Sequence, residues 1–400
     1  MRSNRWLRGL GGALILAGAA LVLIALMAPA SPTPEPLVPT RTPIPLTPTS
    51  EEALASSPSP ASSTPWPPPP AIAPASTPDR SPVTPHALRF TYHGLPRWGI
   101  GVAIGPISRY NVKPLRLGWY QDWRARADPP RPGGIEYVQT VRLREGQLHP
   151  DAATLAAIAQ ANPGSLWLIG NEPDVKWQDN VEPESYARLY HEAYTAIKTA
   201  DPTARVAIGG VSQPTPLRMR YLEAVLRTYR EQFGMKMPID VWNVHNFILR
   251  EERGSWGVDI PPGFPDERGI LYEIDDSGNL EAFRQQIWDF RRWMVAQGYG
   301  GWPLVVSEYG IPMPEDYGFP PERVIAFLGG TFDFFLTATD PSLGDPADGY
   351  RLVQRWAWYS LDAPDTYYPQ GRLFDPQTGA LTAVGEGWVN IVTQRMGGER

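Results

Sequence analysis

Residues 165–174 read SLWLIGNEPD, and this stretch decides how the rest of the chain is interpreted. Its apolar run LWLI has no polar break, which is typical of a strand buried on both faces in a parallel sheet or barrel. Gly170 permits a tight exit, and Asn171 and Glu172 follow at the carboxyl end, where α/β barrels carry their chemistry. Pro173 disfavours a helical backbone at Glu172, so we expect an extended residue with an aimed carboxylate. By itself the stretch is equally compatible with a strand followed by a capped turn.

A second short apolar strand favours the functional interpretation. Residues 303–307 read PLVVS and lead directly into Glu308. Two buried strands then each deliver one glutamate at their exit, and two facing carboxylates are the minimum equipment for glycoside hydrolysis. One carboxyl must hold a proton for the leaving oxygen, and the other must be ionised to attack the anomeric carbon. Different environments and mutual repulsion push the two pKa values apart.

These residues resemble a known group of enzymes. Asn171-Glu172-Pro173 after one strand and Glu308 after a later strand resemble the retaining glycoside hydrolases of clan A over about residues 97–395. Residues 168–174 (LIGNEPD) and 118–123 (GWYQDW) most resemble the catalytic core family of β-1,3-glucanases, glycoside hydrolase family 128. The resemblance implies a (β/α)8 TIM barrel with Glu172 as general acid/base and Glu308 as nucleophile. It also implies retention, with the carboxylates roughly 5 Å apart.

The resemblance implies substrate-binding roles for three polar residues. Asn171 would bind the sugar 2-hydroxyl, although it could instead cap a turn. His245 ends the sixth strand, where it would bond the nucleophile or the sugar, or else serve as a packing histidine. Arg116, placed on the second strand, would bond the nucleophile.

Aromatic residues are expected to stack on sugar rings. Trp356 and Trp358 share one face of the eighth strand. We expect that face to be the barrel interior, with Trp358 beneath the reacting sugar and core filling as the alternative. Trp119, together with Tyr120 and Trp123, is expected to form a further stacking subsite.

Composition excludes several classes of protein. The chain has 400 residues, a net charge of −6 and no cysteine. The charge argues against a nucleic-acid partner, and the missing cysteine excludes disulfides and a cysteine nucleophile. We expect a monomer that uses no cofactor. We also expect no metal, because the acidic group at Asp275, Asp276 and Asn279 is better explained as a capped turn than as a calcium site. Fifteen tryptophans are more than a core needs, which favours a sugar-binding groove.

The first 85 residues differ in composition from the rest. Residues 1–30 combine three arginines with an apolar run over 9–28, which predicts either a retained signal anchor or a signal peptide cleaved near 28–30. Residues 31–85 are rich in proline, serine and threonine, which predicts a disordered linker. The arginines would stay cytoplasmic, so we expect an exported catalytic domain that is membrane-anchored or secreted.

Residues 86–400 carry alternating strand and helix patterns that predict the barrel with seven or more helices. Residues 250–278 form a long excursion that either shapes subsites over the cleft or packs on its own aromatics. The predicted strands cover 98–104, 114–119, 135–141, 166–171, 206–209, 239–244, 303–307 and 355–359. The predicted helices cover 151–161, 184–200, 217–233, 280–297, 321–337 and 382–394.

Several functions share these residues. The leading hypothesis is an endo-β-1,3-glucanase acting on an extracellular polysaccharide. A β-1,4-glucan, mannan or xylan hydrolase, an exo-acting β-glycosidase, a cell-wall transglycosylase and a non-catalytic carbohydrate-binding module are the alternatives.

Overall fold

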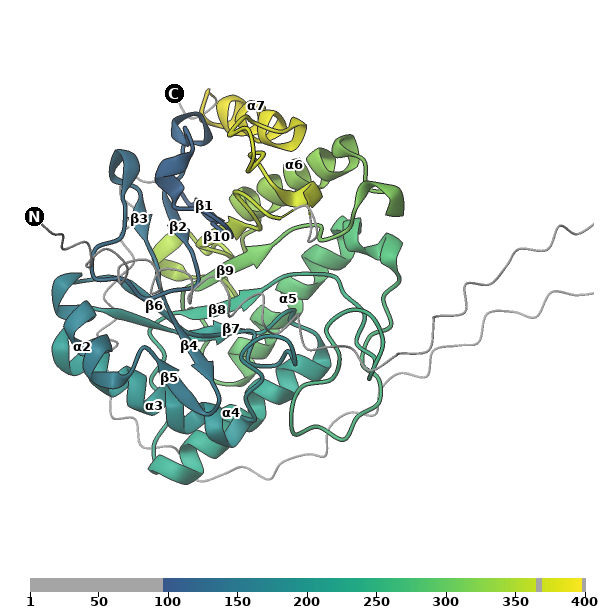
Figure 1. The fold of residues 1–400 in the computed structure, drawn as a ribbon. Helices are drawn as coiled ribbons and strands as arrows, with labels where there is room; N and C mark the ends of the chain where they lie inside the picture. The colour runs from purple at the N-terminus through teal and green to yellow at the C-terminus, as the bar shows by residue number, and fades with distance from the viewer. Residues whose placement is uncertain (1–95, 365–368, 398–400) are drawn as a thin grey trace, which may run out of the picture. The chain divides into compact units, whose positions relative to one another are not determined.

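The computed structural model describes residues 96–364 and 369–397. Eight parallel strand segments form a ring in chain order, with helices on its outside (Figure 1). β7 and β8 join through the parallel bridge Ala207–Val241, and Val138 separates β3 from β4 within one extended segment. The strands of the ring are β1 Trp98–Gly101, β2 Trp119–Gln121, β3 Glu136–Tyr137 with β4 Gln139–Arg144, β6 Leu166–Asn171, β7 Arg205–Gly210, β8 Trp242–His245, β9 Leu304–Tyr309 and β10 Arg355–Trp358.

The described helices follow the later strands. The first two strands are followed only by 3-10 turns, so six α-helices are described where seven or more were predicted. A short strand, β5 Gln147–His149, pairs antiparallel with β4. The α-helices are α2 Ala152–Ala161, α3 Pro183–Ala200, α4 Pro216–Phe233, α5 Leu280–Ala296, α6 Pro321–Thr337 and α7 Ala383–Gly397. The short turns are η1 Ile107–Arg109, η2 Lys113–Leu115, η3 Pro132–Gly134, η4 Ile274–Gly278, η5 Glu315–Tyr317, η6 Pro346–Asp348 and η7 Pro369–Gly371.

This arrangement is the TIM-barrel-like α/β fold expected from the sequence. The helix boundaries agree with prediction within a few residues, and Asp151 caps α2 by accepting from the backbone N–H of Thr154. The main error is the second strand. Residues 113–115 form η2 and β2 begins only at Trp119, because Pro114 lacks a backbone donor and η2 itself ends in the left-handed residue Arg116. The predicted apolar segment and linker before residue 86 lie outside the described residues.

Alternation along the strands separates two hydrophobic layers. Side chains that point outward join the large core beneath the helices. Those that point inward fill the barrel floor, which consists of Trp119, Val138, Leu166, Leu168, Ala207, Val241, Val305 and Ala357. Because the floor is packed solid, chemistry is confined to the layer above it, at the carboxyl ends of the strands.

A buried ion network ties the long excursion over residues 250–278 to the barrel. Arg218 on α4 contacts Asp174 at 3.1 Å and Glu251 at 2.7 Å, and all three side chains are fully buried. Its second terminal nitrogen donates to the carbonyls of Val258 and Asp259. Asp174 therefore holds the loop after Glu172, which agrees with a structural role for this residue.

The aromatic residues of the excursion pack inward. Trp256, Phe264 and Tyr272 are partly buried against the large core, and the Phe264 ring lies 6.3 Å from that of Tyr221 on α4. The excursion therefore packs against the helix layer, and its role in shaping subsites over the cleft stays a prediction. It reaches the loop after β6 through Lys176, whose ammonium lies 4.0 Å from Asp259.

We expect Arg218→Ala to lower the free energy of unfolding by about 3–5 kcal/mol, because it leaves Asp174 and Glu251 buried without their cation. Urea denaturation at neutral pH measures this change. The matched control is Arg220→Ala on the same helix, which removes an exposed pair with Asp266 and should cost less than about 1 kcal/mol. Equal losses in the two variants would contradict the anchoring role of Arg218.

Candidate active site

Glu172 leaves β6 in a conformation the sequence did not predict. Its φ is 44°, in the left-handed region, whereas Pro173 favoured an extended residue. The backbone N–H of Glu172 donates to the carbonyl of Gly210 on β7, which continues the strand pairing to this point. The side chain is 12% exposed, so it can both meet a substrate and lie in a mostly dry environment.

A bulge in β9 aims Glu308 inward. On the β8 side, Val244 pairs with Val306 and His245 with Glu308, so β9 contains one extra residue. The β10 side shows the same insertion, because Trp356 pairs with Val306 and Trp358 with Tyr309. Tyr309 consequently packs in the outer core while Glu308 reaches the site, which is how bulges re-aim side chains near active sites.

His245 joins the two glutamates. Its Nδ1 lies 3.0 Å from Oε1 of Glu172, and its Nε2 lies 3.3 Å from Oε1 of Glu308. One atom from each of the three side chains lies within 4.8 Å of the others, in agreement with the separation of roughly 5 Å expected for a retaining pair. The ring has room because position 210 is glycine, where a Cβ would stand 2.5 Å from the imidazole.

Burial and charge shift the proton affinities of this group. The pKa of Glu308 is raised to about 7, because burial and the charge of nearby Glu172 outweigh the opposing effects of the His245 and Arg142 charges and of the Trp123 hydrogen bond. Burial lowers the pKa of His245, but Glu308 and Glu172 outweigh burial and raise it above its usual value. Glu308 and His245 therefore both hold a proton more readily than the isolated side chains do.

Asn171 is the last residue of β6, and two side chains of the following loop contact it. Its backbone N–H donates to the carboxylate of Asp179, and its side-chain amide nitrogen lies 3.4 Å from Oε1 of the Gln178 side chain. Arg142 at the end of β4 binds both of these partners. Sequence reasoning missed Arg142, whose inward position follows from the alternation that places Val138 and Thr140 inside the barrel. Sugar binding by Asn171 stays a prediction.

The structure moves two predicted residues away from the site. Trp119 is fully buried in the barrel floor, where its indole donates to the carbonyl of Arg97, so it cannot stack on a sugar. Gly99 faces its ring, and a Cβ there would stand 2.5 Å from it. Arg116 ends η2 before β2, is exposed and has a φ of 50°, so it is not the strand residue that was predicted to bond the nucleophile.

The side chain of Trp358 points out of the barrel, whereas the prediction placed it in the barrel interior. Trp356 and Trp358 do share a face, but that face belongs to the outer core, and Ala357 between them lines the floor. Trp358 is fully buried and donates to the carbonyl of Gly371. In the alternation along the chain, Tyr359 falls on the same side as Ala357 and opposite to Trp358. Its ring centre lies 5.7 Å from that of Trp123.

Two further tryptophans lie on loops at the carboxyl ends of barrel strands. Trp123 follows β2 and donates its indole N–H to Oε1 of Glu308 at 2.5 Å. Trp177 lies five residues after Glu172 and is 65% exposed, with the Lys176 ammonium 4.7 Å from its ring centre. The sequence singled out Trp123 only as part of a stacking group, and its contact with Glu308 was missed.

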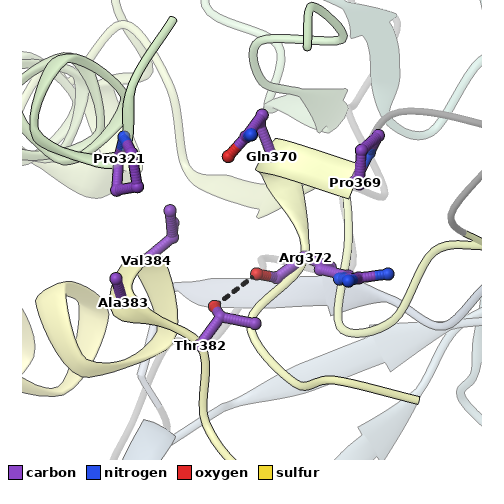
Figure 2. Close-up of a pocket in the computed structure, with 7 residues that line it drawn as sticks. All are labelled: Pro321, Pro369, Gln370, Arg372, Thr382, Ala383 and Val384. Atoms are coloured by element: carbon purple, nitrogen blue, oxygen red, sulfur yellow. Dashed lines mark hydrogen bonds between the residues drawn. The ribbon is translucent and has the colours of Figure 1, made fainter. Parts of the chain in front are cut away.

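A separate hollow lies between the first turns of α6 and α7 and η7 (Figure 2). Pro321, Gln370 and Thr382 are among its lining residues, and Thr382 donates to the carbonyl of Arg372. Neither glutamate nor His245 lines it, so it is distinct from the carboxylate pair.

Ion binding is not needed to explain the acidic groups. The spacing of Glu172, His245 and Glu308 would admit a cation, but both imidazole nitrogens already face a carboxylate. The group at Asp275, Asp276 and Asn279 is a capped turn, as expected, because Asn279 caps α5 and the side chain of Asp276 accepts from the backbone N–H of Glu273, which precedes η4.

A comparison with protein families identifies the chain as similar to glycoside hydrolases. Residues 101–256 match the family model described as the glycosyl hydrolase catalytic core, which confirms the resemblance to a glycoside hydrolase. The match covers Glu172 and His245 but ends before Glu308. No curated protein matches the sequence.

Solved structures of glycoside hydrolase family 128 are similar to the chain. An endo-β-1,3-glucanase of subgroup II from Pseudomonas viridiflava has a TM-score of 0.50 and 17% identity, covering 73% of this chain and 96% of its own. The subgroup II endo-β-1,3-glucanase from Sorangium cellulosum has a TM-score of 0.49 and 18% identity, and the match covers 74% of this chain and 98% of that one. A curdlan-specific exo-β-1,3-glucanase from Blastomyces gilchristii has a TM-score of 0.49 and 21% identity, and the match covers 73% of this chain and 97% of that one. At 17% identity, the likeness to the Pseudomonas viridiflava structure supports the fold alone.

We expect Glu308→Gln to be more stable than the wild type at pH 8 by about 2 kcal/mol. The folded-state pKa of about 7 exceeds the usual 4.5, so the folded protein binds more protons between these values. Wild-type stability should therefore fall as the pH rises through this window, and the neutral amide removes that loss. The advantage should shrink towards pH 4.

Urea denaturation between pH 4 and pH 8 measures the difference. Glu231→Gln is the control, because its side chain on α4 is 66% exposed and the substitution should change stability little at any pH. A Glu308→Gln variant that is less stable than the wild type at pH 8 would show that ionised Glu308 is favoured by its surroundings.

Proposed function

We propose that the protein is a retaining glycoside hydrolase that cleaves β-glycosidic bonds of an extracellular polysaccharide. The observation that carries this proposal is the pair of glutamates at the exits of β6 and β9, joined by His245 with one atom of each side chain within 4.8 Å. At this separation no water fits between the nucleophile and the anomeric carbon, so direct attack by a carboxylate is favoured.

The reaction then has two steps with named roles. Ionised Glu308 attacks the anomeric carbon while protonated Glu172 gives its proton to the leaving oxygen, which breaks the glycosidic bond and forms a glycosyl ester. Glu172, now ionised, takes a proton from a water molecule as its oxygen attacks the anomeric carbon, which breaks the ester bond to Glu308 and releases the sugar with net retention. His245 contacts both carboxylates and can share the proton held by Glu172 across their 3.0 Å contact.

A β-1,3-glucan cut internally is the substrate we favour. This choice rests on the sequence resemblance around Glu172 and on the names of the similar structures, which include endo-β-1,3-glucanases of low identity. Exposed Trp177 on the loop after Glu172 fits a chain that extends beyond the cleaved bond, because sugar rings stack on exposed indoles. Transglycosylation would use the same carboxylates with a sugar hydroxyl in place of water.

Export completes the proposal. The three arginines followed by the apolar run of residues 9–28 support translocation, and residues 31–85 have the composition of a spacer that would hold residues 86–400 away from a membrane. Within the described part of the chain, no helix is long and apolar enough to cross a membrane.

The test is product analysis with the full chain on soluble and insoluble β-1,3-glucan, β-1,4-glucan, mannan and xylan. We expect oligosaccharides from β-1,3-glucan alone. Glu172→Gln should lower this rate by about a hundredfold to ten-thousandfold, because it removes the general acid. The same variant should keep turnover of an aryl glycoside with a good leaving group, and added azide should accelerate it.

Each other outcome has a defined meaning. Release from a different polymer would retain the carboxylate pair and overturn the β-1,3-glucan assignment. Products longer than the substrate would establish transglycosylation. A wild type that is inert on all polymers and on the aryl glycoside, yet still binds glucan, would overturn the enzyme and favour a binding module.

A further inference from the structure

Trp123 makes the shortest contact to either glutamate among the described residues. Its indole Nε1 donates to Oε1 of Glu308 at 2.5 Å, from the loop after β2 to the bulge in β9. An indole N–H only donates, and it does not titrate in the range where enzymes work. It therefore offers Glu308 a hydrogen bond that is the same at every pH.

The barrel leaves space for this indole at one position. Gly101 ends β1 on its inward face, and a Cβ there would stand 2.9 Å from the ring edge of Trp123. A larger residue at this position would push the ring away from Glu308. The ring also contacts Tyr359 at the end of β10, so two strand exits confine it.

The backbone of Trp123 is strained and firmly held. Its φ of 56° is unusual for a bulky residue, which is disfavoured in the left-handed region. On one side, Asp122 accepts from Tyr137 and from Arg126. On the other, the side chain of Gln139 binds both the N–H and the carbonyl of Arg126. Strain that the surroundings enforce in this way is typical of functional sites.

The contacts of Glu308 distinguish its two oxygens. Oε1 accepts from Trp123 and lies 3.3 Å from Nε2 of His245, and the described residues contribute no hydrogen bond to Oε2. Charged neighbours come from two other strands, namely Glu172 after β6 and Arg142 on β4. The carboxylate is thus fixed through one oxygen and open at the other.

We propose that Trp123 is a positioning residue that holds Oε1 of Glu308, so that Oε2 is the oxygen that attacks the anomeric carbon. This inference rests on the proposed glycosidase function. The bond favours the ionised carboxylate, since a donor stabilises the charged form of its acceptor. It also favours one angle of attack, because a hydrogen bond at one oxygen restrains the rotation of the carboxylate about its terminal bond.

The test is Trp123→Phe, which keeps an aromatic ring and removes the N–H. The substrate is an aryl β-glucoside with a good leaving group, because its cleavage depends little on the general acid. We expect kcat/KM to fall by about tenfold to a hundredfold. The acidic limb of its pH profile should move to higher pH, because Glu308 loses a donor that favours ionisation.

Trp98→Phe is the matched control. Trp98 on β1 is also buried and donates its indole N–H, in this case to the carbonyl of Leu115 on the outer side of the barrel. It should leave the pH profile in place even if it lowers stability. An acidic limb in Trp123→Phe that matches the wild type would overturn the inference, whatever the size of the rate loss.

Failure of the inference and failure of the proposed function are distinguishable. An inert wild type would reject the glycosidase itself, whereas an active wild type with an unmoved profile in Trp123→Phe would reject only the role of Trp123. Should Trp123→Phe not fold, Gly101→Ala tests the same contact, because the new methyl group displaces the ring. It is expected to move the acidic limb in the same direction, and an unmoved limb would again overturn the inference.

Discussion

The contact of His245 with both glutamates is the constraint around which the site is built. Two carboxylates at this distance repel each other, and burial penalises both charges. The imidazole between them, at 3.0 Å from one and 3.3 Å from the other, can carry a positive charge or supply a proton to either side. Removing this bridge would leave Glu172 and Glu308 facing each other directly, with no group between them to share a proton.

The barrel makes room for that constellation by alternating large side chains with glycine. Gly210 gives space to the His245 ring on one side of the site. On the other side, Gly99 and Gly101 lie two residues apart on β1 and face Trp119 and Trp123 in turn. Gly99 and Trp119 pack together at the barrel floor, whereas Gly101 lies beside Trp123, which donates to Glu308. Packing and chemistry are therefore two successive layers of the same inward-facing rows.

The sequence predicted the barrel and the two glutamates, because Glu172 and Glu308 each follow a strong apolar strand and strand exits gather at one end of the barrel. His245 was predicted from its place at a strand end and from the family resemblance. The sequence could not tell the two faces of a strand apart when both are buried. Trp358 was placed on the wrong face for this reason, although the alternation itself was correct. Trp119 was placed in the wrong layer, since depth within a barrel depends on where β2 begins. The bulge at Glu308 and the left-handed Glu172 likewise depend on neighbouring strands.

The most direct test of the retaining pair is to trap its covalent intermediate. The full chain would be incubated with an activated 2-deoxy-2-fluoro-β-glucoside, which slows the second step, and then digested for peptide mass spectrometry. The account predicts a single fluoroglycosyl adduct on Glu308, which an excess of glycosyl acceptor releases with recovery of activity. An adduct on Glu172, or an active enzyme that forms no adduct and yields the inverted anomer, would contradict it.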